Sequence, residues 1–228
     1  MSTIADNIQL VSSRIQAAVT AANRAENSVQ LLAVSKTKPA QALREAYAAG
    51  LRDFGENYLQ EALGKQLELA DLPLIWHFIG PIQSNKTRAI AEHFDWVHSV
   101  DRLKIAQRLS EQRPAELPPL NICIQVNVSG EASKSGCTPA DLPALAAAIN
   151  ALPRLKLRGL MAIPEPTEDR AEQDAAFAAV QKLQASLDLP LDTLSMGMSH
   201  DLESAIAQGA TWVRIGTALF GARDYSQS

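Results

Sequence analysis

The sequence predicts an α/β fold: a single (β/α)8 barrel of the TIM type with an additional helix at its N-terminus. Eight short apolar runs alternate with stretches of helix length, which is the element order of a parallel α/β protein. The chain has 228 residues, and barrels of this type need at least about 200. A hydrophobic content of 46% supports a sizeable core.

The first predicted element is an amphipathic helix over residues 4–22. Its apolar side chains recur at spacings of three and four, which places them on one helix face. These side chains are Ile4, Ile8, Val11, Ile15, Ala18, Val19 and Ala22.

Eight apolar runs after this helix are predicted to be strands. They cover residues 31–36, 53–57, 76–80, 96–100, 121–129, 157–163, 193–199 and 212–221. Several of them show no regular polar alternation, as expected of parallel strands that are covered on both faces. No Gly-x-Gly-x-x-Gly motif follows the first run, so a closed barrel is favoured over a dinucleotide-binding doubly wound sheet.

The stretches between these runs are predicted to be helices. They cover residues 42–50, 58–69, 84–94, 101–112, 140–152, 170–187 and 200–209. Gly50 and Gly209 are typical of glycines that end a helix. The proline-rich segment 113–120 is expected to be a loop, and no linker or repeat divides the chain. Residues 1–228 are therefore expected to form one domain.

Composition excludes several classes of function. The net charge of −4 and the aromatic content of 5% do not match a nucleic-acid surface. The N-terminus lacks the basic start and apolar stretch of a signal peptide, and no run is long enough for a membrane helix, so a cytoplasmic protein is expected. The two cysteines lack metal-ligand spacing, no His/Asp/Glu cluster suggests a metal, and no metal site is expected.

The predicted site lies at the carboxyl ends of the strands, where barrels of this type carry their active sites. Polar residues or glycines occur at or near most of these ends. They are Lys36, Glu56, Asn57, Gly80, Gln83, Asn85, Ser99, Asn127, Ser199, Gly216 and Thr217, with Met161 at the end of the sixth run.

Lys36 is the one amine in this predicted ring. Burial disfavours the charged form of a lysine and lowers its pKa, so that more free amine is present to attack a carbonyl and form a Schiff base. The other interpretation is that Lys36 extends from the strand end into solvent, as Lys38 can.

The ends of the last two strands suggest a phosphate site, which barrels often build there from loop amides. Ser199 precedes a helix, and Gly216 allows close backbone approach beside the Thr217 hydroxyl. Ser199 has an alternative role as the N-cap of the following helix.

Arg214 lies two residues before Gly216 on the same strand face. Because a buried guanidinium needs an acceptor, the sequence leaves two interpretations open: an ion pair with a carboxylate such as Glu56, or a ligand contact. His77 and His98 are expected to be core histidines. Asn57 is a better candidate for a ligand contact than Asn85, because it follows a strand directly.

Several consecutive segments closely resemble one known family. They lie in order between Leu31 and Arg223 and read LLAVSKTKP, FGEN, WHFIGPIQSNK, VNVSGEASKSG, RGLMAIP, LSMGMSHDLESAI and VRIGTALFG. On these segments the chain resembles the pyridoxal phosphate homeostasis protein family, the YggS/PROSC type. The resemblance covers nearly the whole chain.

The resemblance implies pyridoxal 5′-phosphate (PLP) held as a Schiff base on Lys36, in a modified TIM barrel like the N-terminal domain of alanine racemase. It implies a phosphate site made by Ser199 and the amides of Gly216 and Thr217, with Arg214 facing the pyridine nitrogen. Asn57 and Met161 are implied as neighbours of the ring.

The family also implies binding rather than turnover. Racemases of this fold use a lysine and a tyrosine as two bases, and the tyrosine comes from an additional domain that is expected to be missing here. Tyr47, Tyr58 and Tyr225 are not obvious substitutes. We therefore expect a monomeric protein that takes part in intracellular PLP homeostasis by sequestering PLP or delivering it to apo-enzymes, and so affects amino-acid and keto-acid metabolism indirectly. Lys134 is a candidate secondary acceptor during delivery.

Two alternatives stay open. The first is a low-activity monomeric amino-acid racemase that depends on PLP. The second is a cofactor-free aldolase that forms a Schiff base with a phosphorylated sugar.

Overall fold

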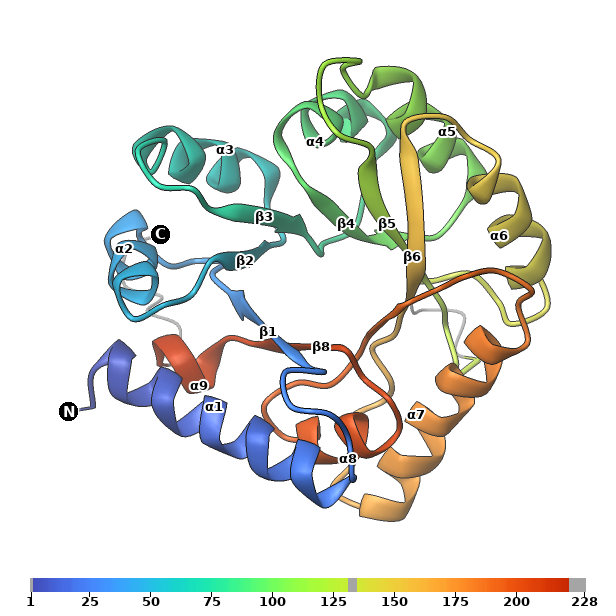
Figure 1. Cartoon of the computed structure of the whole chain (residues 1–228). Coiled ribbons are helices and arrows are strands. Elements are labelled where there is room, and N and C mark those ends of the chain that lie inside the picture. The colour runs from blue at the N-terminus through green and yellow to red at the C-terminus, as the bar shows by residue number, and fades with distance from the viewer. Residues whose placement is uncertain (1, 131–134, 222–228) are drawn as a thin grey trace.

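The structure is a computed structural model that describes residues 2–130 and 135–221. Eight parallel strands form a closed barrel in the order of the chain (Figure 1). The strands are β1 Gln30–Val34, β2 Asp53–Glu56, β3 Ile75–Phe78, β4 Trp96–Val100, β5 Leu120–Gln125, β6 Leu155–Met161, β7 Thr193–Ser195 and β8 Trp212–Ile215. The barrel closes where β1 pairs with β8, with Ala33 opposite Ile215. The predicted fold class is confirmed.

Helices surround the barrel and connect its strands (Figure 1). They are α1 Ile4–Ala21, α2 Ala40–Ala48, α3 Leu59–Glu68, α4 Thr87–His93, α5 Leu103–Gln112, α6 Leu142–Asn150, α7 Arg170–Ala185, α8 Leu202–Ala207 and α9 Thr217–Phe220, with a 3₁₀ turn at Ser84–Lys86. Gly50 and Gly209 have positive φ angles directly after Ala49 and Gln208, the C-cap residues of α2 and α8, as their predicted role requires. No helix in the described part of the chain is long and apolar enough to cross a membrane.

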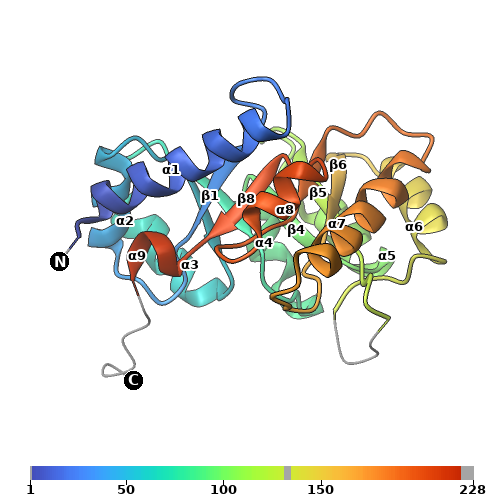
Figure 2. The same cartoon turned by 90° about the horizontal axis from the view of Figure 1, so that it is seen from below.

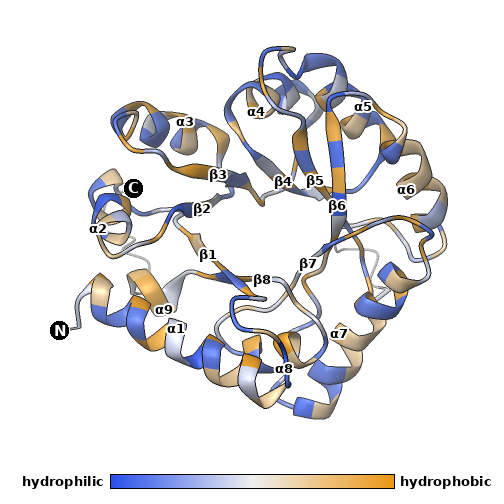
Figure 3. Ribbon diagram, viewed as in Figure 1, coloured by the Kyte–Doolittle hydropathy of each residue, from blue (hydrophilic) through white to orange (hydrophobic). Residues whose placement is uncertain are grey.

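The main hydrophobic core lies between the outer face of the barrel and the helices. Phe54, Leu120 and Ile122 on strands are fully buried, as are Leu43, Ile105 and Leu109 on helices. The barrel interior is more polar, since the buried His77, His98 and Arg214 lie on the same strands as Trp96, Trp212 and Met161 or on their neighbours. Figure 3 shows this mixture as hydrophilic and hydrophobic residues along the same strands.

The additional helix α1 packs along the elements that follow the last two strands (Figure 2). Its start is fixed by a capping box in which Thr3 and Asp6 exchange hydrogen bonds. Asn7 Nδ2 then donates to the carbonyl oxygen of Leu219 in α9 at 2.9 Å. In the segment after α1, Arg24 Nη1 donates to the carbonyl oxygens of Ile206 in α8 and Ala210 beyond it. Helix α1 and the segment that follows it thus contact both α8 and α9.

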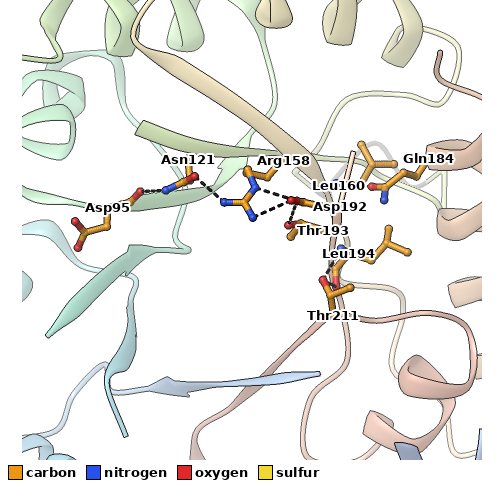
Figure 4. Close-up of polar contacts among 9 residues, drawn as sticks. All are labelled: Asp95, Asn121, Arg158, Leu160, Gln184, Asp192, Thr193, Leu194 and Thr211. Carbon is orange, nitrogen blue, oxygen red and sulfur yellow. Dashed lines mark hydrogen bonds and ion pairs between the residues drawn. The ribbon is translucent and has the colours of Figure 1, made fainter. Parts of the chain in front are cut away.

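The amino ends of the strands are joined by a polar network centred on Arg158 (Figure 4). Its guanidinium donates to both carboxylate oxygens of Asp192 at 2.9 Å and to Asn121 Oδ1 at 2.9 Å. The same group lies over the Trp96 ring, 4.6 Å from its centroid. In barrels of this type this end serves stability, and the opposite end carries the site.

The last two predicted strands are shorter than the apolar runs. Strand β7 ends at Ser195, and Gly197 has a φ of 97°, which is outside the range of a strand. Strand β8 ends at Ile215, and the rest of that run forms α9. Both differences arise at glycines, where the chain leaves the sheet to form loops.

Candidate binding site at the strand ends

A cavity of about 300 Å³ opens at the carboxyl ends of the strands. Its lining contains six of the seven predicted site residues, namely Lys36, Asn57, Ser199, Arg214, Gly216 and Thr217. They come from the ends of β1, β2, β7 and β8, which the barrel closure makes neighbours. The ends of these four strands thus form one concave site, whereas the other members of the expected ring do not line it.

Met161 is the predicted site residue that lies apart. It is fully buried in a cluster with Trp96 and Cys123 and is not among the lining residues. Sequence reasoning places it at the end of β6, which is right, but its side chain packs inside the barrel with that cluster.

The segment that carries Lys36 is held by buried ionic groups. Lys65 Nζ, from α3, donates to the carbonyl oxygen of Ser35 and to Glu56 Oε1, both at 2.7 Å. Thr37 has a φ of 63°, and its N–H donates to Glu61 Oε1 at 2.6 Å. Lys36 is half-buried between these two anchored neighbours and lines the cavity.

The buried Glu56 carboxylate also holds the segment that carries Lys36. Burial raises the pKa of Glu56, although Lys65 and the Ser35 hydroxyl oppose that rise. Ser35 Oγ donates to Glu56 Oε1 at 2.6 Å, whereas Oε2 is buried without a hydrogen-bond partner. The predicted alternative of an Arg214–Glu56 ion pair is wrong, because Glu56 pairs with Lys65 and Arg214 donates to Ser195 and Ala162 instead.

Arg214 is a buried cation in the wall of the cavity, only 4% exposed. Its Nη1 donates to Ser195 Oγ at 2.9 Å, and its Nη2 donates to the carbonyl oxygen of Ala162 at 3.0 Å. No carboxylate of the described residues forms an ion pair with it. Burial lowers the pKa of Arg214 to about 10. The guanidinium has further N–H groups that can donate to a neutral or anionic acceptor in the cavity.

The two loops predicted to bind phosphate meet in the cavity. Gly216 approaches β1 so closely that an added Cβ would lie 3.3 Å from the Val34 carbonyl oxygen. Helix α9 starts at Thr217, so its first amides have no partner within the helix. Ser199 is not an N-cap, because α8 is preceded by Asp201, whose Oδ1 accepts from the N–H of Met198.

Asn57 adds an unsatisfied acceptor to the same cavity. Its Oδ1 is buried and has no hydrogen-bond partner. Such groups are rare in folded proteins, because an unpaired buried oxygen is costly. Asn85, the weaker candidate, is exposed in the 3₁₀ turn and does not line the cavity.

Five other residues of the lining were not predicted as site residues: Val34, Ile79, Ile163, Met198 and His200. Val34 ends β1 and Ile79 follows β3, whereas the other three lie on loops two to five residues beyond the observed ends of β6 and β7. Extending the search past the ends of β6 and β7 would have found these three. Ile163 is 43% exposed, so it gives the mouth of the cavity an apolar edge.

Comparison with known proteins assigns the chain to a family. The alanine racemase N-terminal domain family matches residues 4–224. The pyridoxal phosphate homeostasis protein of Pseudomonas aeruginosa is 78% identical over 225 residues, which cover 99% of this chain and 98% of that protein. The chain belongs to the pyridoxal phosphate homeostasis protein family. The protein of that name from Escherichia coli K12 is 55% identical over 233 residues and is covered completely.

Solved structures agree with this assignment. PipY of Synechococcus elongatus PCC7942, in a structure with PLP bound, is 45% identical and has a TM-score of 0.85, covering 96% of this chain and 100% of that chain. Alanine racemase from Corynebacterium glutamicum has a TM-score of 0.68 at 17% identity, covering 99% of this chain and 62% of its own. The racemase likeness shows a shared fold.

Proposed function

We propose that this protein binds PLP in the cavity at the strand ends and takes part in intracellular PLP homeostasis. The observation that carries the proposal is the convergence of one lysine, one buried arginine and two phosphate-type loops in a single cavity of about 300 Å³. The cofactor is the one bound in the PipY structure, which shares 45% of its sequence with this chain.

The residues present fit each part of the cofactor. The amides that begin α9, the Thr217 hydroxyl and Ser199 form a polar pocket suited to the phosphate. Arg214 has N–H groups for the pyridine nitrogen, and the buried Asn57 Oδ1 is an acceptor for the ring hydroxyl. Lys36 lines the same cavity as these groups.

PLP supplies an aldehyde, and a primary amine such as Lys36 Nζ condenses with it to form a Schiff base. The other lining residues bind and orient. An arginine opposite the ring nitrogen donates a hydrogen bond without protonating that nitrogen, which weakens the ring as an electron sink. This environment favours retention of the cofactor over chemistry on amino acids.

A racemase role receives less support from the site. Such an enzyme needs a second base on the other face of the ring, and neither described candidate tyrosine lines the cavity. Tyr47 packs against the Arg52 guanidinium, 3.8 Å from its ring centroid, and Tyr58 is exposed. Tyr225, like the proposed secondary acceptor Lys134, lies outside the described residues.

We propose further that the protein acts as a cytoplasmic monomer that releases PLP to apo-enzymes. The open mouth of the cavity and its exposed Ile163 edge support this role. Size-exclusion chromatography of the loaded protein, followed by reactivation of an apo-aminotransferase across a mixing series, tests it. A dimer, or no reactivation, would contradict this part of the proposal.

The proposed site is tested by borohydride reduction of the PLP-loaded protein and peptide mapping. We expect a visible absorbance band and a pyridoxyl adduct on Lys36, both lost in Lys36→Ala. Lys38→Ala is the matched control, because Lys38 lies two residues away and its Nζ donates to the carbonyl oxygens of Phe220 and Gly221. An adduct on another lysine would refute the assignment.

The two alternatives make different predictions in the same preparation. A racemase would remove the α-deuterium of an amino acid at catalytic rates. A cofactor-free aldolase would be colourless, and borohydride would trap Lys36 only when a sugar phosphate is present. We expect neither result.

A further inference from the structure

A chain of buried polar side chains crosses the inside of the barrel and ends at Arg214. Asp53 Oδ1 lies 2.9 Å from His77 Nε2, and His77 Nδ1 lies 2.9 Å from His98 Nε2. His98 Nδ1 lies 2.8 Å from Ser195 Oγ, which accepts from Arg214 Nη1 at 2.9 Å. The chain thus runs from the amino end of β2 to the cavity wall on β8.

The groups at the two ends of this hydrogen-bonded chain fix the direction in which each of its hydrogen bonds is donated. A carboxylate only accepts, so His77 must carry its proton on Nε2, and its bare Nδ1 must accept from His98 Nε2–H. His98 Nδ1 is then bare and accepts the Ser195 hydroxyl proton. Because that proton is committed to His98, the Ser195 oxygen presents a lone pair to Arg214. Each hydrogen bond of this chain is therefore donated from the Arg214 side towards Asp53.

The packing around the histidines holds this arrangement in place. Both imidazoles are fully buried, and the His77 ring stacks on Trp96 with an interplanar angle of 9°. Trp212 packs against the edge of His77 at 5.0 Å between centroids. Burial lowers the pKa of both histidines, so neutral tautomers are the expected forms. Asp53 alone reaches towards solvent, with its side chain 22% exposed.

We propose that Asp53 is a positioning residue for Arg214: it fixes the direction of the hydrogen-bonded chain, so that the Ser195 oxygen accepts from the buried guanidinium. The inference rests on the proposed function, because Arg214 is taken to contact the pyridine nitrogen of PLP. Through Ser195, Asp53 then influences the ring nitrogen from the opposite end of the barrel.

The first test uses the protein without cofactor. Histidine ¹⁵N NMR is expected to show both His77 and His98 as neutral Nε2–H tautomers at neutral pH. In Asp53→Asn the carboxamide can donate as well as accept, so Nδ1–H forms should appear. Asp192→Asn is the matched control, since Asp192 lies at the same end but binds Arg158. Nδ1–H forms in the wild type, or unchanged tautomers in Asp53→Asn, would overturn the proposal.

The second test follows the effect to the cavity. With ¹⁵N-labelled PLP bound, Asp53→Asn should shift the ring-nitrogen resonance, whereas Asp192→Asn should not. In a Ser195→Ala background the chain is cut, and Asp53→Asn should produce no further shift. Bound PLP with no response to Asp53→Asn overturns the inference and leaves the proposed function intact. Failure of PLP to bind overturns the proposed function, while the tautomer measurement still decides the direction of the chain.

Discussion

At the scale of single residues, Lys65 and Arg214 show how differently two buried cations can be placed. Lys65 is paired with Glu56 and serves the segment that carries Lys36. Arg214 has only neutral oxygen partners among the described residues and lines a cavity. Sequence position left the role of Arg214 open, and the family resemblance implied that it is a site residue. It could not predict Lys65, because a buried lysine on α3 has the same spacing as a solvated one.

Thr217 allows a direct test of the phosphate site. Thr217→Val keeps the shape of the side chain and removes the hydroxyl, so PLP affinity should fall roughly ten- to a hundredfold, as for a hydrogen bond to a charged group. Equilibrium titration followed by absorbance measures the change. The affinity for pyridoxal, which lacks the phosphate, should stay the same; an equal loss for both ligands would place Thr217 away from the phosphate.

The buried histidines predict a particular loss of stability in acid. Burial, with His77 and Arg214 nearby, holds the pKa of His98 well below its usual value. The unfolded chain, whose histidines titrate near pH ~6.5, then binds more protons than the folded one below that pH. The free energy of unfolding should therefore fall as the pH decreases below ~6.5, by up to about 1.4 kcal/mol per pH unit for each such histidine.

Urea unfolding across this pH range checks the sign. His98→Gln should give a shallower slope than the wild type, because one depressed group is removed. The exposed His93→Gln is the control and should keep the wild-type slope. Since Glu56 and the other carboxylates are the same in all three proteins, their contributions cancel in the comparison. Equal slopes for wild type and His98→Gln would contradict the account.

At the scale of elements, α1 is part of the binding apparatus although none of its residues lines the cavity. Arg14 Nη2 donates to the carbonyl oxygen of Ser199 at 3.1 Å, and the same guanidinium pairs with Glu203 on α8. The amphipathic pattern predicted this helix within one residue of its observed end. Its contact with the Ser199 loop depends on long-range packing, which the pattern does not contain.

Arg14→Met should separate the role of α1 in the site from its role in stability. Methionine keeps the apolar part of the side chain and removes the hydrogen bond to Ser199. We expect weaker PLP binding with little change in the free energy of unfolding, because exposed ion pairs contribute little. Titration and chemical unfolding measure the two quantities. Arg44→Met, which removes the exposed pair with Asp71, should leave binding unchanged.

The loop after β7 depends on Gly197. Its φ of 97° is strained for other residues, and an added Cβ would lie 2.5 Å from the Ala205 Cβ. Gly197→Ala should therefore cost about 1–3 kcal/mol of stability and move the Ser199 loop. Gly50→Ala is a useful comparison, because Gly50 also has a positive φ but has no atom within 4 Å of the added Cβ. Equal losses in both variants would show that crowding at Gly197 contributes nothing.

At the scale of the whole molecule, barrel closure creates the site. Lys36 and Gly216 are 180 positions apart in the chain, yet β1 and β8 are paired, and their ends form one wall. The alternation of apolar runs and helices predicted this closure, and with it that the ends of the first and last strands would meet. The exact side-chain directions, such as that of Met161 into the barrel, were beyond sequence reasoning because they depend on how the strands tilt and pack.

The most direct test of the central claim is a crystal structure of the protein loaded with PLP. We predict electron density continuous with Lys36 Nζ, the phosphate against Ser199, Gly216 and Thr217, and the ring nitrogen within hydrogen-bond distance of Arg214. Cofactor density elsewhere, or a phosphate that does not contact the loops after β7 and β8, would contradict the account.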